Sequence, residues 1–374
     1  MALSALVIGG TGPTGPGVVR GLLDRGFDVT ILHGGQHEVE LPGEVRHLHT
    51  DPHWPETLGA GLGRAEFDLV VAQYGRLAVT AQVLAGRTDR VVAVGGAHGS
   101  LAHAADPRWG TLGRPAMPAE DAEYLEQDPA QGTLAVKMAA AEKALFDAHA
   151  AGAFAATLLA YPVVYGPRQV APHEWCIVRR ILDGRRRIVV ADGAFRMESR
   201  LYTEHAVHAV LLAVDHREAA SGRKFVVADD DVFTMRQRIE FVAARLGAEV
   251  ELVDMPYQLA TPCHPYWRHG PDHRLRGNAR VRAELGYADT VRPADALGAT
   301  VDWLVENPPA PGGPEEKRLG DRFDYAHEDD LMVRWAALRD GWADDADPFR
   351  PVHAYRHPRR PDEAWHSGGP ATQS

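Results

Sequence analysis

The chain has 374 residues, of which 45% are hydrophobic and 24% charged, and this length is enough for one large domain or two closely packed ones. Its formal net charge of −11 at pH 7 gives no positive field to neutralise a phosphate backbone, so we expect no nucleic-acid partner. No window approaches the roughly 20 apolar residues that span a bilayer, so we expect no membrane partner either.

The first half of the chain alternates short apolar runs with helical patterns. We predict strands at 5–8, 29–32, 45–48, 69–72, 91–94 and 157–160, and helices at 16–25, 77–86 and 134–150. Parallel strands require crossover connections of this kind. The pattern therefore predicts an α/β fold, a Rossmann-type doubly wound parallel sheet with helices on both faces.

After residue 166 the alternation is less regular. We predict helices at 174–183, 204–214, 234–246, 293–305 and 325–340, and strands at 187–190, 223–227 and 249–253. The proline-rich run 307–314 is predicted to be a linker, because proline lacks an amide donor and restricts its neighbour. We therefore expect a dinucleotide-binding domain over 1–166, a smaller mixed α/β substrate-binding part over 167–306, and a linker, helix and tail over 307–374.

A glycine-rich turn joins the first predicted strand to the first helix, with Gly9, Gly12 and Gly15 at three-residue spacing. Glycine permits a tight turn, close approach of a pyrophosphate and close helix–strand packing, and the helix N-terminus favours phosphate. The strand–turn–helix context favours this interpretation over glycines that serve packing alone. We predict a nicotinamide dinucleotide site here, and we assign Thr14 and Ala72 to it.

The end of the second predicted strand bears on the choice between NAD and NADP. An acid about twenty residues past the turn normally binds the ribose of NAD, but residues 32–37 here read Leu-His-Gly-Gly-Gln-His. No arginine is present to bind a 2′-phosphate, although His33 or His37 can approach one, so we expect NADP ahead of NAD. Asp51, just after the third strand, is a candidate adenine contact or else a solvated turn residue.

Two landmarks together resemble the extended short-chain dehydrogenase/reductase family, which includes the NAD-dependent epimerases and dehydratases. The first is the glycine turn. The second is the run 161–168, Tyr-Pro-Val-Val-Tyr-Gly-Pro-Arg, which is similar to the family's Arg-Pro-x-x-Val-Tyr-Gly-Pro signature. In that family the second landmark lies against the nicotinamide, and the resemblance implies that role for Tyr161, Pro162, Val163 and Val164.

A third segment, 199–206, is similar to the family's Arg-Asp-Phe-x-x-Val-x-Asp-x-Ala segment in the substrate half. Arg200 matches the position at which relatives that act on sugar nucleotides present an arginine to the substrate diphosphate, a role suited to the guanidinium fork. The alternative is an ion pair with Glu198 or Glu204. We also assign His173 and Tyr266 to substrate binding.

The residues that the family uses for proton transfer are only partly present. Relatives usually carry a Ser or Thr after the fifth strand and a Tyr-x-x-x-Lys on the next helix. Here Lys137 keeps the lysine, Thr133 stands at the tyrosine position, and no hydroxyl follows the fifth strand. An aliphatic hydroxyl is a far weaker acid than a phenol, whose pKa is about 10. We therefore add His98 and Tyr165 as catalytic candidates, with an ordinary structural role as the alternative for each.

These gaps leave three functions open. The first is an NAD(P)-dependent oxidoreductase that acts on a small metabolite, cyclic or sugar-like among the options, with non-standard proton-transfer residues. The second is an epimerase or dehydratase that retains its cofactor, and the third is a non-catalytic NAD(P)-binding sensor or regulator. Relatives often pair through helices beside the fifth strand, which implies a homodimer through 77–86 and 134–150.

Cysteine and histidine usage bears on location and on metals. Only Cys176 and Cys263 are present, too few for a disulfide framework, and the apolar start of the chain lacks a basic leader, so we expect a cytoplasmic protein. Cys263, His264, His269 and His273 lie in a proline-interrupted loop without zinc-ligand spacing, so we expect no metal.

Overall fold

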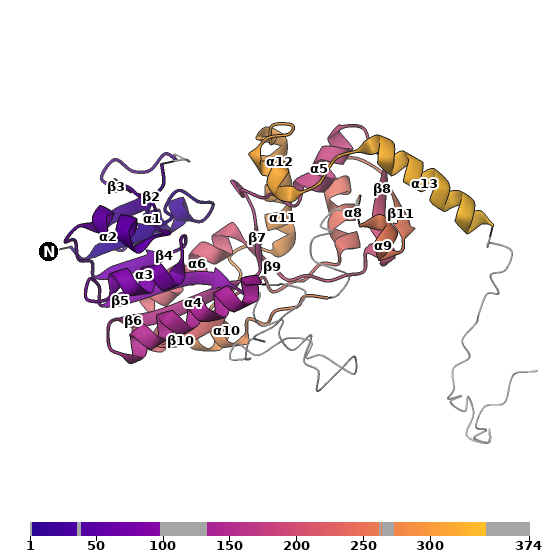
Figure 1. The fold of residues 1–374 in the computed structure, drawn as a ribbon. Helices are drawn as coiled ribbons and strands as arrows, with labels where there is room; N and C mark the ends of the chain where they lie inside the picture. Colours follow the sequence, from indigo (N-terminus) through magenta and orange to yellow (C-terminus); the bar gives the residue numbers. More distant parts are fainter. Residues whose placement is uncertain (1, 36–38, 98–132, 262, 264–272, 342–374) are drawn as a thin grey trace, which may run out of the picture. The chain divides into compact units, whose positions relative to one another are not determined.

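The computed structural model describes residues 2–35, 39–97, 133–261, 263 and 273–341, with the backbone alone at 133–135. The chain divides into two compact units, residues 1–324 and 325–374. The described part of the second unit is mainly helix α13 (Tyr325–Asp340). Among the described residues, no helix is long and apolar enough to cross a membrane. The remaining elements all belong to the first unit (Figure 1).

A seven-stranded parallel sheet forms the centre of the first unit, in the order β10-β6-β5-β4-β1-β2-β3. Its strands are β1 (Ser4–Ile8), β2 (Asp28–His33), β3 (Arg46–His49), β4 (Leu69–Ala72), β5 (Arg90–Gly96), β6 (Ala155–Tyr161) and β10 (Arg223–Val226). Every residue of β4 is buried, as expected for a strand covered on both faces. The predicted Rossmann-type α/β fold is confirmed.

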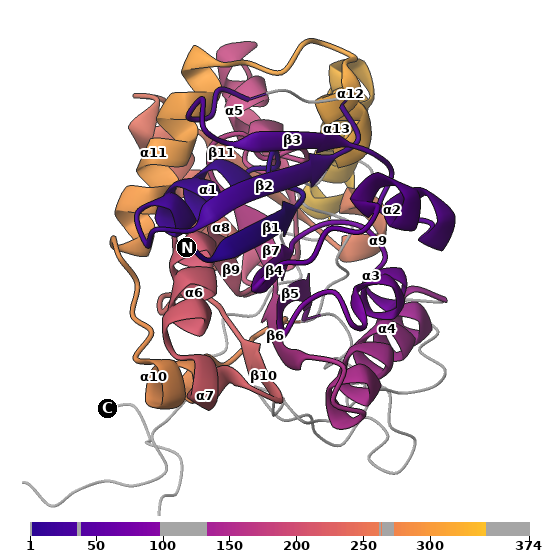
Figure 2. The same ribbon diagram turned by 90° about the vertical axis from the view of Figure 1, so that its left-hand side faces the viewer.

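Helices cover the two faces of this sheet (Figure 2). Helices α1 (Gly15–Leu23) and α6 (Thr203–Asp215) pack on one face, while α2 (Pro55–Leu62), α3 (Leu77–Leu84) and α4 (Thr133–Ala150) pack on the other. Alternate residues of β1 enter the two cores, Ala5 and Val7 on the first face, Leu6 and Ile8 on the second. This alternation explains why residues 5–8 of the strand are all apolar.

Glycines let α1 and α6 approach closely. A Cβ atom on Gly17 would lie 2.8 Å from the Val207 side chain, and one on Gly21 would lie 2.4 Å from the Leu211 side chain. Two glycines of α1 therefore serve packing, as distinct from the glycines of the preceding turn.

The chain returns to the sheet after residue 166. Strand β10 pairs with β6 in parallel, from Arg223 opposite Thr157 to Val226 opposite Ala160. Strand β10 is therefore part of the sheet, and α6 is part of the layer that covers it. Both lie inside the range 167–306, which we assigned to a separate part. The first compact unit also extends past residue 306, to residue 324.

Beside the sheet, the first unit has smaller elements with a third core. Two-stranded parallel sheets join β8 (Arg187–Ala191) to β11 (Glu251–Met255) and β7 (Val163–Tyr165) to β9 (Arg200–Tyr202). The helices are α5 (Trp175–Leu182), η2 (Asp192–Ala194), α7 (Arg217–Ala220), α8 (Met235–Arg245), α9 (Tyr257–Ala260), α10 (Ala279–Leu285), α11 (Pro293–Glu306) and α12 (Pro314–Leu319). The apolar faces of α5, α8 and α11 meet in the third core.

The proline-rich run predicted to be a linker is fixed in place. It leads into α12, which begins with Pro314, a residue suited to the first turn of a helix. The buried Glu316 carboxylate accepts hydrogen bonds from Trp175 Nε1 at 2.8 Å and from the Gly312 amide at 2.7 Å. These bonds join α12 to α5 and to the end of the run 307–314, which has no helix or strand before Pro314. Tertiary partners far away in the sequence decide its conformation.

Candidate functional site

A cavity of about 1270 Å³ lies at the carboxyl ends of the sheet strands. Its walls come from the glycine turn, from the residues that end or follow β2, β3, β4 and β6, and from parts of the segment 303–318. Open α/β sheets bind ligands at this edge. The position of the cavity therefore agrees with a ligand site built on the glycine turn.

The three turn glycines meet different surroundings. Gly9 has a φ of +92°, and a Cβ there would lie 2.6 Å from Tyr74 Cβ. A Cβ on Gly15 would lie 2.2 Å from the Gly10 carbonyl oxygen, whereas one on Gly12 would meet only the Gly9 oxygen, at 3.6 Å. Gly12 also lines the cavity. The backbone at Gly12 is therefore open to a close-fitting ligand, while Gly9 and Gly15 serve turn and packing.

The start of α1 adds hydrogen-bond donors to this wall. The first amides of a helix have no acceptor inside the helix, and they carry its positive dipole end. Thr14 does not cap α1 with its side chain; its hydroxyl donates to Gln73 Oε1 at 2.7 Å. Within the described part of the chain, the buried Gln73 Nε2 has no hydrogen-bond partner, and Gln73 lines the cavity. Together these donors suit an anionic, oxygen-rich ligand such as a pyrophosphate.

His33 is the last residue of β2, and it stands where NAD sites usually have an acid. It is buried, lines the cavity, and accepts the Gly35 amide on Nδ1 at 3.3 Å. Its Nε2 lies 3.3 Å from His47 Nδ1. Glu40 also lines the cavity, so the structure brings one acid to it from beyond β2.

Asp51 lines the cavity as well, next to two rings. Its Oδ1 accepts the His53 amide at 2.9 Å and lies 2.6 Å from His53 Nδ1. These hydrogen bonds from His53 lower the pKa of Asp51 below its ordinary value, so it is a carboxylate at neutral pH. The rings of His53 and Tyr74 meet edge to face, with centroids 5.0 Å apart. This group offers a planar base both an aromatic surface and a hydrogen-bond acceptor.

The second sequence landmark contributes to two walls. Tyr161 and Val164 line the large cavity, whereas Pro162 and Val163 line a separate hollow of about 20 Å³. The Tyr161 hydroxyl donates to the Ala206 carbonyl at 3.0 Å, and burial raises its pKa. Tyr161 is therefore an uncharged wall rather than a proton-transfer group.

Tyr165, a predicted catalytic residue, is 1% exposed and lines neither cavity. Its hydroxyl donates to the Pro293 carbonyl at 3.4 Å, and burial raises its pKa. The structure corrects the prediction for Tyr165, because this burial leaves the residue in the core with Tyr202 and Leu297.

The other predicted catalytic residues lie on or before α4, or outside the described residues. Lys137 is exposed on α4 and does not line the large cavity. Thr133 is the first residue of α4, and its side chain is not described. His98 and the substrate candidate Tyr266 lie outside the described residues. Ala72, which we assigned to the cofactor site, is buried at the end of β4, and the next two residues line the cavity instead.

Arg200 and His173, both predicted to bind substrate, contact each other. Arg200 is 2% exposed; its guanidinium lies 2.7 Å from the Glu198 carboxylate and 3.0 Å from His173 Nδ1. Neither residue lines the large cavity. The ion pair with Glu198, the alternative in the sequence interpretation, is the one that forms.

Sequence reasoning missed two parts of the cavity wall. Gln73 and Tyr74 directly follow a predicted buried strand, and that position at a strand end is a signal that was available. The parts of the wall within 303–318, which include Trp303, Asn307 and Arg318, had no such signal, because they end or follow a predicted helix rather than a strand. Only folding brings them to the cavity.

Comparisons with known proteins point to one fold. No protein-family model and no curated protein matches the sequence. Among solved structures, a UDP-galactose 4-epimerase is 18% identical, with a TM-score of 0.61 over 82% of this chain and 100% of that one. A dTDP-glucose 4,6-dehydratase from Bacillus anthracis str. Ames in complex with NAD is 14% identical, with a TM-score of 0.62 over 82% of this chain and 98% of that one.

A UDP-glucuronic acid 4-epimerase from Bacillus cereus, in complex with UDP-glucuronic acid and NAD, is also similar. It is 16% identical, with a TM-score of 0.63 over 82% of this chain and 100% of that one. Identities this low establish the fold rather than the reaction. The chain therefore has the Rossmann-type α/β fold of these epimerase and dehydratase structures.

Proposed function

We propose that the chain is an NAD(P)-dependent oxidoreductase that acts on a small metabolite. The observation that carries the proposal is the strand–glycine turn–helix unit on the wall of the 1270 Å³ cavity, with Gly12 open to that cavity. Structures of the same fold in complex with NAD support a dinucleotide ligand. When bound, the nicotinamide supplies or accepts a hydride.

Different residues of this chain would bind different parts of the cofactor. The turn glycines and the first turn of α1 hold the pyrophosphate, with the free Gln73 amide as a further donor. Asp51, His53 and Tyr74 receive the adenosine end. Tyr161 and Val164 form the wall for the nicotinamide, as the family resemblance implies.

We favour NADP over NAD. The feature that supports this preference is His33, which takes the place of the ribose-binding acid at the end of β2 and lines the cavity. A neutral imidazole carries no negative charge, so it does not repel a 2′-phosphate as a carboxylate would. Glu40, which also lines the cavity, favours NAD instead. Comparing the affinities for NADPH and NADH shows which of the two residues decides the preference.

Position 133 holds a threonine rather than a tyrosine, so another residue must transfer the proton. We propose His98, because it follows Ala97, which borders the hollow beside Pro162 and Val163. An imidazole has a pKa near neutrality and suits proton transfer. The exposed Lys137 is proposed to hold the cofactor, and Thr133 to assist, as their motif positions imply.

A second candidate is an epimerase or dehydratase that retains its cofactor. The wall formed within 303–318 supports it, because Glu316 anchors this segment and its cavity-lining residues would add contacts that retain a bound dinucleotide. Small sugar-like molecules are the proposed substrates for either candidate. We also propose that the protein is cytoplasmic, because its two cysteines are too few for a disulfide framework, and that it forms a homodimer through α3 and α4, which light scattering would test.

The test of the site is a fluorescence titration with NADPH and NADH. We expect saturable binding that weakens at least 100-fold in Gly12→Arg, because the new side chain enters the cavity at the pyrophosphate position. The matched control is Gly43→Arg, since Gly43 is exposed and a Cβ there meets nothing within 4 Å. If the folded, cofactor-free protein binds neither nucleotide, the proposed function is wrong.

A further inference from the structure

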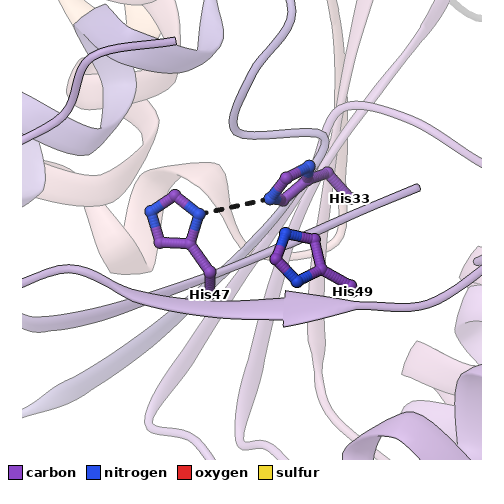
Figure 3. A group of neighbouring side chains, drawn as sticks. All are labelled: His33, His47 and His49. Carbon is purple, nitrogen blue, oxygen red and sulfur yellow. Dashed lines mark hydrogen bonds between the residues drawn. The ribbon is translucent and has the colours of Figure 1, made fainter. Parts of the chain in front are cut away.

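Three histidines gather at one edge of the sheet (Figure 3). His33 ends β2, and His47 and His49 belong to β3, the edge strand. His33 is directly opposite His49 in the parallel register. His47 and His49 are two residues apart, so both side chains leave β3 on the same face. The strand pairing therefore brings His33 together with His47 and His49, which follow it by fourteen and sixteen residues in the sequence.

The spacing of the ring nitrogens fits a metal ion. One nitrogen from each ring can be chosen so that all three lie within 4.8 Å of one another, and His33 Nε2 is 3.3 Å from His47 Nδ1. Zinc binds imidazole nitrogen at about 2.0–2.1 Å, so two ligands of a tetrahedral site lie about 3.3 Å apart. One pair already has this separation, and the 4.8 Å limit for the trio means that small side-chain adjustments suffice to bring the third imidazole, from the exposed His49, to the same ion.

We propose that His33, His47 and His49 form a binding site for a divalent first-row transition metal, with Zn²⁺ the first candidate. Three imidazoles suit zinc, copper and nickel, whereas magnesium and calcium prefer oxygen ligands. Three protein ligands leave a fourth position for water or a bound molecule. The site uses none of the cysteine and histidine residues at 263–273 that the sequence analysis considered for a metal.

Metal binding changes one hydrogen bond. In the structure, His33 Nδ1 accepts the Gly35 amide, so the neutral ring carries its proton on Nε2, toward His47. Ligation through Nε2 moves this proton to Nδ1, and the Gly35 contact is lost. That bond is 3.3 Å long, at the weak end of the range, and three metal–nitrogen bonds replace it. The site therefore forms at small cost.

The experiment uses the full chain without added tag histidines, treated with a chelator and titrated with ZnCl₂ by calorimetry. We expect one tight ion per chain, and at least 30-fold weaker binding in His47→Ala and in His49→Ala. The control is His53→Ala, a nearby histidine that contacts Asp51 and is not part of the trio. Co²⁺ in place of Zn²⁺ should give the intense visible absorption of a tetrahedral site, lost in His47→Ala.

Two results would overturn the metal site: Zn²⁺ affinity equal in the wild type and His47→Ala, or a weak octahedral Co²⁺ spectrum. The same samples are titrated with NADPH. Because His47 does not line the dinucleotide cavity, metal-free His47→Ala should bind NADPH as the wild type does. The metal site and the proposed function can thus fail separately.

Discussion

At the scale of single residues, His33 is the side chain most directly tied to cofactor choice. It stands at the end of β2 and lines the cavity where relatives of this fold place a ribose-binding acid. We predict that His33→Asp weakens NADPH binding about tenfold, or about 1.4 kcal/mol, and strengthens NADH binding, because a carboxylate accepts ribose hydroxyls and repels a 2′-phosphate.

Fluorescence titration of both nucleotides measures this change. Glu40→Gln is the companion variant, since it removes the acid that lines the cavity from beyond β2. It should weaken NADH binding alone. An unchanged ratio of the two dissociation constants in His33→Asp would contradict the assignment of the 2′-phosphate to His33.

At the scale of elements, the buried pair of Arg180 and Asp321 joins α5 to the residues that follow α12. Arg180 is fully buried, and its NH1 donates to Asp321 Oδ2 at 2.6 Å. Removal of the carboxylate takes this close charge partner away from a fully buried guanidinium. We predict that Asp321→Ala lowers the free energy of unfolding by about 3–5 kcal/mol.

Urea denaturation followed by circular dichroism measures the loss. The control is Asp302→Ala, which breaks the exposed pair of Arg245 and Asp302, for which we expect a change of less than about 1 kcal/mol. Similar losses in the two variants would mean that burial adds nothing to the Arg180 pair.

A second pair links α6 to the residues that follow β10. His205 Nδ1 lies 2.8 Å from Asp229 Oδ1, and both side chains are buried. Burial lowers the pKa of His205, but the hydrogen bond and the charge of Asp229 outweigh it, so the pKa is raised above its ordinary value. Protonated His205 therefore stabilises the folded protein.

The sign of the pH dependence follows. This contribution is complete below the ordinary histidine pKa of about 6.5 and is lost as the pH rises through the raised value. We predict that the free energy of unfolding falls between pH 6 and pH 9, and that His205→Gln flattens this part of the profile. Denaturant unfolding at several pH values tests it; equal slopes in the two proteins would contradict the prediction.

At the scale of the whole molecule, the fold does not choose the reaction, because one fold hosts several chemistries. We expect net oxidation of NADPH with small cyclic or sugar-like carbonyl compounds. His98→Ala should bind NADPH normally and lose turnover at least 100-fold, the usual size of a general acid–base contribution. His216→Ala, a change at an exposed histidine, is the control.

The outcome of this assay separates the proposals. A dinucleotide that copurifies and is not consumed during turnover would support the epimerase or dehydratase. Binding without turnover of any compound would contradict both enzymes and leave a regulator. Normal turnover in His98→Ala would remove His98 from proton transfer.

Much of the fold could be predicted from the sequence, because its signals are local. Buried parallel strands read as short apolar runs, and the glycine turn lies between such a run and a helix. The predicted strands at 5–8, 69–72 and 157–160 fall within β1, β4 and β6, and the second landmark supplied two residues of the cavity wall, Tyr161 and Val164.

The tertiary structure alone decided the rest, because those features depend on partners distant in the sequence. Tyr165 is buried against α11 and is therefore no longer a catalytic candidate. The Arg200 side chain contacts Glu198 and His173 rather than the cavity. The proline-rich run at 307–314 leads into α12, which contacts α5, and residues 307–310 line the cavity. Parallel pairing of β2 with β3 brought His33 beside His49. Residue types and local periodicity determine which elements form. They do not determine which side chains come together when those elements pack, because those contacts join residues far apart in the sequence.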